Sequence, residues 1–216
     1  MVGLVVSVNV GVPKETLWQG RTVRSAIWKY PVDGSVAIRG VNADGDDQAD
    51  RKVHGGVDKS LYAYGAEDYE WWSSRLGRTL PPGQFGDNLT VRGIDVSAAL
   101  IGERWTAGSA TLEVTEPRIP CYKLAMRMQD PKFPRAFTAA LRPGAYMRIV
   151  AEGSARSGDA VSVAHRPSHG LSIRKMFDIY SFHRERLGEF LEVAELSDGW
   201  KEWAAKNVRP LQIDHS

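Results

Sequence analysis

Two hydrophobic periods follow each other along this chain, and that change restricts its possible folds more than any other feature. From Gly3 to about Arg166, short β-prone runs are separated by glycines, a pattern typical of a barrel or a sandwich. After Pro167 the apolar residues recur with a period of roughly 3.6, which indicates helices. We therefore expect a mainly β fold with α: a β domain over residues 1–166 and a small three-helix unit over residues 167–216.

The β region contains several runs that we expect to form strands: residues 4–10, 36–41, 60–64, 89–94, 104–107, 111–115, 146–151 and 160–165. Residues 104–115 form the clearest hairpin, because residues 107–109 supply turn chemistry between two alternating runs. Trp105, Leu112 and Val114 should then lie in the core. A second hairpin is expected over residues 146–165, with a connection loosened by glycine and serine.

Helices are expected at two places inside the β region and throughout the tail. Residues 67–76 form a helix ended by Gly77, and residues 135–141 form one ended by Pro143 and Gly144. In the tail, helical spacing relates the apolar residues of 173–180 and of 187–194, and a third helix follows an N-cap at Ser197. We expect the tail aromatics Phe177, Trp200 and Trp203 to fill a helical core; the alternative is that they dock a redox partner.

Composition excludes several classes of protein. The chain has 216 residues, with 28 Lys and Arg against 26 Asp and Glu, and its 25% charged and 43% hydrophobic content is that of an ordinary globular protein. No run of like charges is longer than a few residues, so polymeric nucleic acid is disfavoured as a partner. No apolar run reaches the ~20 residues of a membrane helix. The single cysteine, Cys121, excludes an intrachain disulfide and fits a reducing compartment, so we expect a cytoplasmic protein.

A glycine-containing loop before the strand at 60–64 combines groups suited to binding an anion. Adjacent glycines let backbone amides approach a ligand, and cations neutralise it. The loop residues concerned are Arg51, Lys52, His54, Gly55, Gly56 and Lys59. The simpler alternative is a charged turn that enters a strand.

A second glycine-containing loop, residues 85–89, precedes the strand at 89–94. Its Asn88 offers both a donor and an acceptor to a heterocycle. Alternatively, Asp87 and Asn88 satisfy the amides of their own turn. On the helix before it, we expect one of Trp71 and Trp72 to be buried and the other to lie at the rim.

Cys121 lies just after the clearest hairpin, among prolines and the cations Arg118 and Lys123. Positive neighbours favour the thiolate, which binds metals and attacks electrophiles. A buried, inert cysteine is the alternative. A Cys–His hydrolase is disfavoured because no family signature surrounds Cys121, and zinc is disfavoured because the histidines lack a suitable ligand spacing.

Four motifs occur in a specific order: HGGxDK at 54–59, FGDNL at 85–89, IGE at 101–103 and EPRIPCYKL at 116–124. Together they resemble the MOSC family, named after the C-terminal domain of molybdenum cofactor sulfurase. YMRIVAEG at 146–153 and the helical tail are similar to the YiiM-like subgroup, whose members append a 3-alpha domain. The resemblance covers nearly the whole chain and implies a β-barrel-like MOSC fold.

The resemblance also implies a molybdenum cofactor, a pterin dithiolene with a phosphate tail, and assigns Cys121 as the metal ligand. The family's glycine-rich and asparagine motifs correspond here to His54, Gly55, Gly56, Lys59 and Asn88. One soft thiolate suits a metal that already has two dithiolene sulfurs. Arg118 and Lys123 would help to neutralise the cofactor, and Arg51, Lys52 or Lys59 could contact its phosphate.

YiiM-like proteins and mitochondrial amidoxime-reducing components are associated with the reduction of N-hydroxylated compounds, including hydroxylaminopurine bases. The resemblance therefore implies a molybdenum-dependent oxidoreductase, with His54 either as a catalytic proton donor or in a structural role. No flavin, nicotinamide or iron–sulfur signature is present, so an external protein must donate electrons. The alternatives are a carrier of cofactor or sulfur without turnover, and a binding domain that has lost metal chemistry.

Overall fold

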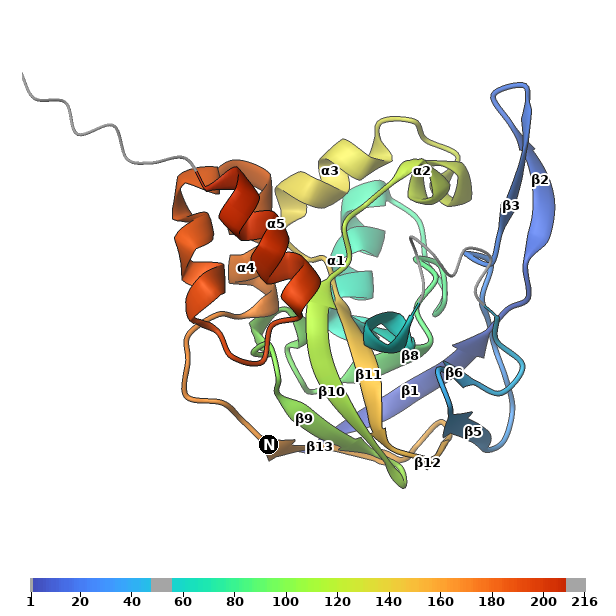
Figure 1. The fold of residues 1–216 in the computed structure, drawn as a ribbon. Helices are drawn as coiled ribbons and strands as arrows, with labels where there is room; N and C mark the ends of the chain where they lie inside the picture. Colours follow the sequence, from blue (N-terminus) through green and yellow to red (C-terminus); the bar gives the residue numbers. More distant parts are fainter. Residues whose placement is uncertain (1, 48–55, 209–216) are drawn as a thin grey trace, which may run out of the picture.

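The computed structural model describes residues 2–47 and 56–208, and seven strands of this part close into a barrel (Figure 1). They are β1 (Val2–Val10), β7 (Leu61–Gly65), β8 (Leu89–Arg92), β9 (Arg104–Ala107), β10 (Ala110–Pro117), β11 (Ala145–Ala151) and β13 (Ala160–His165). Their order is β13-β9-β10-β11-β7-β8-β1, and antiparallel pairing of β1 with β13 completes the ring. The mainly β fold with α is thereby confirmed.

The β7–β8 pair is parallel, whereas the other neighbours in the barrel are antiparallel. Parallel neighbours need a crossover connection rather than a tight turn. Helix α1 (Ala66–Leu76) lies on that connection and ends at Gly77, whose φ of 64° is the left-handed conformation that glycine adopts readily. Helix α1 contacts both ends of β8: Glu67 accepts the Gly93 amide after the strand, and the Tyr69 hydroxyl donates to Asp87 in the 85–89 loop before it.

Smaller strands surround the barrel. The short strand β4 (Tyr30–Pro31) extends β1, and β12 (Gly153–Ala155), β5 (Val36–Arg39) and β6 (Asn42–Ala43) form a separate sheet. Strands β2 (Lys14–Trp18) and β3 (Arg21–Ser25) form a hairpin that extends away from the body of the molecule (Figure 1). The sequence analysis missed this hairpin, because its alternation is carried by charged residues and threonine rather than by a hydrophobic face.

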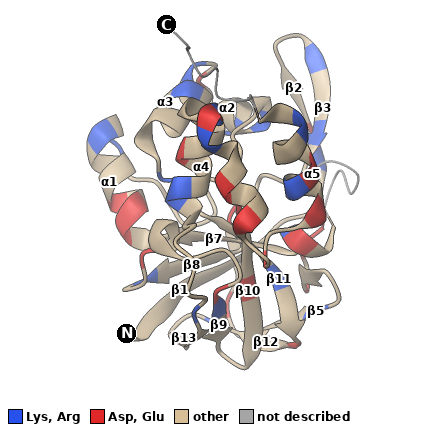
Figure 2. Ribbon diagram, turned by 60° about the vertical axis from the view of Figure 1, so that its left-hand side comes forward, with Lys and Arg blue, Asp and Glu red and all other residues tan. Residues whose placement is uncertain are grey.

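The helices gather at one end of the barrel (Figures 1 and 2). Besides α1 they include α2 (Tyr122–Met128), α3 (Phe133–Ala140), α4 (Ile173–Phe182) and α5 (Asp198–Asn207). The described residues also form 3-10 helices: η1 (Val57–Lys59), η2 (Val96–Ala98) and η3 (Arg184–Glu192). The helices predicted at 67–76 and 135–141 are therefore confirmed within two residues, whereas α2 was not predicted.

The hairpin predicted at 104–115 is confirmed, and Trp105, Leu112 and Val114 are buried as expected. The hairpin predicted at 146–165 is wrong. Strand β11 pairs with β10 and β7, and β13 pairs with β9 and β1. The segment between them forms β12, which pairs with β5 and so separates the two strands.

The tail packs into the same hydrophobic core as the barrel. This core contains Trp105 and Leu112 of the barrel together with Ile173, Leu187 and Phe190 of the tail. The middle tail helix is a 3-10 helix, and Leu187, Phe190 and Val193 are buried at its spacing of three residues. The α-helical spacing expected there was wrong; the division into domains at residue 166 stays a prediction.

A second core cluster is mainly aromatic and lies between the barrel end and helices α1 to α3. Phe85 is at its centre, with ring centroids 5.0 Å from Tyr64 and 5.7 Å from Phe133. As expected, Trp72 is buried in this cluster while Trp71 is half-buried beside Arg142. In the part of the chain that the structure describes, no helix has the length and apolar character needed to cross a membrane.

Candidate functional site

Cys121 connects the barrel to the helices. Strand β10 is paired on both sides and ends at Pro117, opposite Ala145 of β11. Four residues later Cys121 is the N-cap of α2, and its carbonyl accepts the Leu124 amide at 2.9 Å. Its thiol is free and half-buried. The paired strand thus fixes where the thiol lies, and the prediction that it follows a strand end agrees with this geometry.

Two cavities meet at Cys121. We call the first the basic chamber, because its lining includes the cations Lys29, Lys59, Arg118 and Lys123. The other residues that line it are Ser25, Ala26, Ile27, Asp46, Asp47, Ser60, Tyr62, Phe85, Gly86, Asn88, Ile119, Cys121 and Tyr146. The structure thereby brings together five residues that the sequence predicted for the site: Lys59, Asn88, Arg118, Cys121 and Lys123.

The second cavity, of about 500 Å³, lies between the barrel end and the helical tail. We call it the aromatic chamber. Its lining residues are Lys59, Glu116, Pro117, Ile119, Pro120, Cys121, Tyr146, Tyr180, Ser197, Gly199, Trp200 and Trp203. Lys59, Ile119, Cys121 and Tyr146 line both chambers, so Cys121 lies on their boundary.

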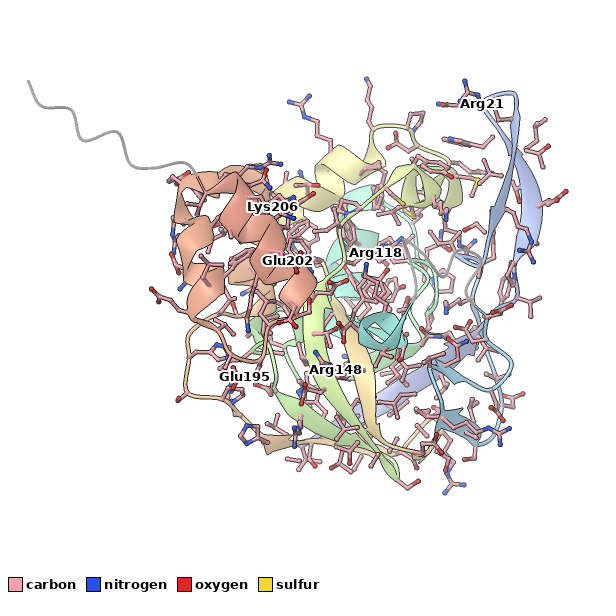
Figure 3. All side chains as sticks on the ribbon, in the orientation of Figure 1. Arg21, Arg118, Arg148, Glu195, Glu202 and Lys206 are labelled. Carbon is pink, nitrogen blue, oxygen red and sulfur yellow. The ribbon has the colours of Figure 1, made fainter. Side chains whose placement is uncertain are left out.

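Arg118 is a buried cation of the basic chamber, and Figure 3 shows it within the body of the protein. Its Nη1 donates a hydrogen bond to the Phe85 carbonyl, and its guanidinium lies 5.2 Å from the centre of the Tyr62 ring. Burial lowers the pKa of Arg118, but Tyr62, Tyr146 and Cys121 outweigh that effect and raise it overall. A guanidinium held in this way stays charged and is suited to an anionic ligand.

Lys29 and Asp46 form a buried ion pair in the same chamber. Burial lowers the pKa of Lys29, and the carboxylate of Asp46 counteracts it. Asn88 donates to Asp46 Oδ2 at 2.9 Å and accepts the Tyr62 amide at 3.1 Å. The amide of Asn88 is thus engaged within the protein, and this residue positions the Lys29–Asp46 pair.

The sequence analysis did not identify Lys29 or Asp46. The available signal was weak: Lys29 is a lone cation in the apolar run AIWKY at residues 26–30. A charged residue in such a run is seldom buried without a partner. Its partner lies 17 residues away, which the sequence pattern does not reveal.

Lys59 is placed by η1, which is tied to the barrel. The Thr115 hydroxyl donates to the Asp58 carbonyl at 2.6 Å, and Arg148 pairs with the Asp58 carboxylate at 3.2 Å. Lys59 Nζ then lies 3.1 Å from Glu116 Oε1 and 5.9 Å from the centre of the Tyr146 ring. This cation therefore lies on the boundary between the two chambers.

Glu116 is buried beside Lys59, and Trp200 Nε1 of the tail donates to its Oε2. Burial raises the pKa of Glu116, while Lys59 and Trp200 lower it by less. The carboxyl group thus connects a cation of the barrel to an indole of the tail. Sequence reasoning quoted Glu116 in a motif without assigning it a role.

The loop before η1 is only partly described. Gly56 precedes η1 with a φ of 101°, a conformation that favours glycine. The predicted site residues Arg51, His54 and Gly55, together with Lys52, lie outside the described residues. Their roles stay predictions.

Asp87 forms its hydrogen bonds with other residues of the protein and holds its loop in place. It is buried, accepts hydrogen bonds from the Tyr69 and Thr90 hydroxyls and from the Asn9 amide, and does not line either chamber. Next to it, Gly86 has a φ of 80° and a Cβ there would lie 3.0 Å from Ile27. The 85–89 loop therefore closes tightly against the β3–β4 connection and forms one wall of the basic chamber.

Comparison with known proteins agrees with the architecture and the motifs. A family model of the MOSC domain matches residues 50–162. YflK of Bacillus subtilis (strain 168) is 31% identical over 215 residues, 97% of each chain, and YiiM of Escherichia coli (strain K12) is 28% identical over 82% of this chain and 81% of its own. The crystal structure of YiiM from Geobacillus stearothermophilus superposes with a TM-score of 0.78 at 31% identity, covering 96% of this chain and 100% of that one.

The fold is a closed barrel, and its single cysteine lies between a basic and an aromatic cavity. The chain belongs to the MOSC domain family, whose members are associated with binding the molybdenum cofactor. Within that family it is YiiM-like. A Gibberella moniliformis protein named reductase is 31% identical over 76% of this chain, which spans 30% of that protein.

Proposed function

We propose that this protein is a molybdenum-cofactor-dependent reductase of N-hydroxylated compounds such as hydroxylaminopurine bases, with Cys121 as the metal ligand. The observation that carries the proposal is the position of Cys121, whose residue lines both a basic and an aromatic chamber. A thiol placed in this way can bind a metal from one side while the other side admits a substrate. The relative named reductase is consistent with redox chemistry on this domain.

The residues of the basic chamber fit the cofactor in their chemistry. Cys121 is the one cysteine of the sequence, which suits a metal that arrives with two dithiolene sulfurs and needs one protein thiolate. Arg118, Lys123 and Lys59 line the same chamber and would neutralise the negative charge of a pterin phosphate. Lys29 is already paired with Asp46, so these two residues together add little net charge to the chamber.

When bound, the molybdenum centre supplies the two-electron chemistry of oxygen removal. Reduction of R–NHOH breaks the N–O bond, consumes two electrons and two protons, and yields R–NH2 and water. In this proposal Cys121 would hold the metal, and the cations of the basic chamber would hold the negatively charged cofactor. Electrons come from an external donor protein, and His54 remains the predicted proton donor.

The test is the molybdenum and pterin content of protein made in a host with an intact cofactor pathway. We expect Cys121→Ser to lose at least nine-tenths of the bound metal while its urea unfolding midpoint stays close to that of the parent. Tyr122→Phe is the matched control, because Tyr122 is the next residue and is exposed; it should keep its metal. Stoichiometric molybdenum in Cys121→Ser would show that the ligand is assigned wrongly.

A turnover assay separates the reductase from a carrier. Loaded parent protein is mixed with a chemical reductant and 6-hydroxylaminopurine, and formation of adenine is followed. We expect multiple turnovers for each bound metal. Cofactor bound in stoichiometric amount with no adenine formed would instead favour the carrier of cofactor or sulfur.

A further inference from the structure

The aromatic chamber has walls from two parts of the chain that are far apart in sequence. One wall comes from the end of the barrel, including Glu116 and Cys121, and the other from α4 and α5, including Tyr180, Trp200 and Trp203. In Figure 1 the connection from β10 to α2, which carries Cys121, passes beside α5. The tail therefore completes a cavity next to the thiol rather than lying apart from it.

Three aromatic rings of the tail form one cluster on this wall. The Tyr180 ring lies 5.5 Å from Trp200 and 5.3 Å from Trp203, and the two indoles are 5.6 Å apart, all measured between ring centroids. Tyr180, Trp200 and Trp203 are only half-buried. Aromatic rings that are partly covered in this way offer edges and faces to a further ring.

The fully buried core of the tail consists of other residues, and Trp200 and Trp203 pack against it from the side that faces the chamber. Phe177 and Phe190 are each 0% exposed, and other apolar residues of α4 and η3 are buried with them. The sequence analysis expected Trp200 and Trp203 to have the same role as Phe177. All three pack in or against the core as expected, but Phe177 is enclosed, whereas the two tryptophans also line a cavity.

The polar groups of the chamber are few and fixed. Among the described residues that line it, the charged ones are Lys59 and Glu116, and these pair with each other. Trp200 Nε1 donates to the other Glu116 oxygen, which fixes the indole plane. A mostly apolar cavity of about 500 Å³ with a few convergent polar groups is typical of a small-molecule site.

We propose that Tyr180, Trp200 and Trp203 form a ring-recognition subsite that selects uncharged, flat aromatic or heteroaromatic ligands. The ring lies against the tail, and Glu116 accepts a hydrogen bond from its polar edge. The reacting substituent is directed toward Cys121; this last step rests on the proposed function, whereas recognition of the ring does not. The tail thus determines specificity, and the barrel supplies the reactive centre.

The test uses two uncharged probes that differ only in the ring, benzamide and cyclohexanecarboxamide. Each is titrated into the full-length chain made without cofactor, and binding is followed by tryptophan fluorescence and calorimetry. We expect benzamide to bind about 10-fold more tightly. Trp203→Leu should weaken benzamide binding about 5- to 10-fold, as expected for the loss of one aromatic contact, and change cyclohexanecarboxamide less than twofold.

Phe182→Leu is the matched control, because Phe182 lies on α4, is 52% exposed and does not line the chamber. It should leave both affinities unchanged. Tyr180→Leu is a second variant that keeps the test decisive if Trp203→Leu fails to fold. Equal affinities of the two probes for the parent, or equal effects of the chamber and control variants, would overturn the subsite.

These outcomes are independent of the cofactor test. If the parent prefers benzamide but Cys121→Ser retains its metal, the subsite is supported and the assignment of Cys121 as metal ligand is rejected. In loaded protein, Trp203→Leu should raise KM for a ring N-hydroxy substrate with little change in kcat. Loss of kcat alone would mean that Trp203 acts on the reactive centre and not on the ring.

Discussion

The two chambers that meet at Cys121 are held in different ways. The basic chamber depends on buried charges with fixed partners: Arg118 is tied to the Phe85 carbonyl, and Lys29 to Asp46. The aromatic chamber depends on half-buried rings of the tail that contact one another. Removing one member of a buried ion pair is costly in stability, because the other charge is left unpaired. Contacts between half-buried rings can rearrange at a lower cost. We therefore predict that the basic chamber, proposed for the cofactor, is rigid and that the aromatic chamber, proposed for the substrate, is adjustable.

The largest effect should come from breaking the Lys29–Asp46 pair. Asp46→Ala leaves a buried lysine without its carboxylate, and such losses cost about 3–5 kcal/mol of stability. Adding Lys29→Met should recover at least half of that cost, because the unpaired charge is then removed. Urea unfolding of the parent, both single variants and the double variant measures the cycle.

The exposed pair Arg39–Asp44 is the control for this experiment, since both of its side chains are largely in solvent. Asp44→Ala should cost less than about 1 kcal/mol. If Asp46→Ala were as mild as Asp44→Ala, the basic chamber would not be the rigid side of the site, and the contrast between the chambers would fail.

A smaller effect is expected where the two chambers are joined. Trp200→Phe keeps an aromatic ring but removes the indole hydrogen bond to Glu116. Removing the partner of a buried acceptor costs about 1–3 kcal/mol, and Lys59 still pairs with the carboxylate, so we expect the lower end of that range. Thermal unfolding of Trp200→Phe against Trp203→Phe measures it; equal losses would show that ring volume matters and the hydrogen bond does not.

The smallest effect concerns pH. Burial raises the pKa of Glu116, so the folded state binds its proton more tightly than the unfolded state. As pH rises above the usual value of 4.5, the unfolded chain releases the proton first, and stability falls until the folded pKa is passed. A tenfold difference in proton affinity between the two states corresponds to about 1.4 kcal/mol. Glu116→Gln should flatten this part of the stability curve, and an unchanged slope from pH 4.5 to 7 would contradict the raised pKa.

Much of the fold could be predicted from local patterns. The 104–115 hairpin follows from alternation on both sides of a turn, and the end of α1 from Gly77. The 146–165 hairpin was mispredicted because partner choice is not a local property: β12 turns aside to pair with β5, more than 100 residues earlier. The β2–β3 hairpin lies outside the barrel and lacks the apolar face that sequence patterns detect.

The site was predictable only where motifs carried it. Asn88, Arg118, Cys121 and Lys123 were found because they occur in recognisable runs, and the structure gathers them at one chamber. The Lys29–Asp46 pair and the tail wall were not found, because each depends on contacts between distant segments. Asn88 was expected either to face a ligand or to satisfy its own turn; it lines the basic chamber while hydrogen-bonding within the protein, and its role toward a ligand stays a prediction.

The closing of the barrel by β1 and β13 has a consequence for biosynthesis. These strands are the first and last of the barrel in chain order, and Val2 to Leu4 pair with residues near 160. At a translation speed of about 5–20 residues per second, roughly 8–30 seconds separate the emergence of the two strands from the ribosome. Throughout that interval one edge of β1 stays open, and open edges invite aggregation. The edge of β1 that β13 covers thus gains its partner only after most of the barrel has been synthesised.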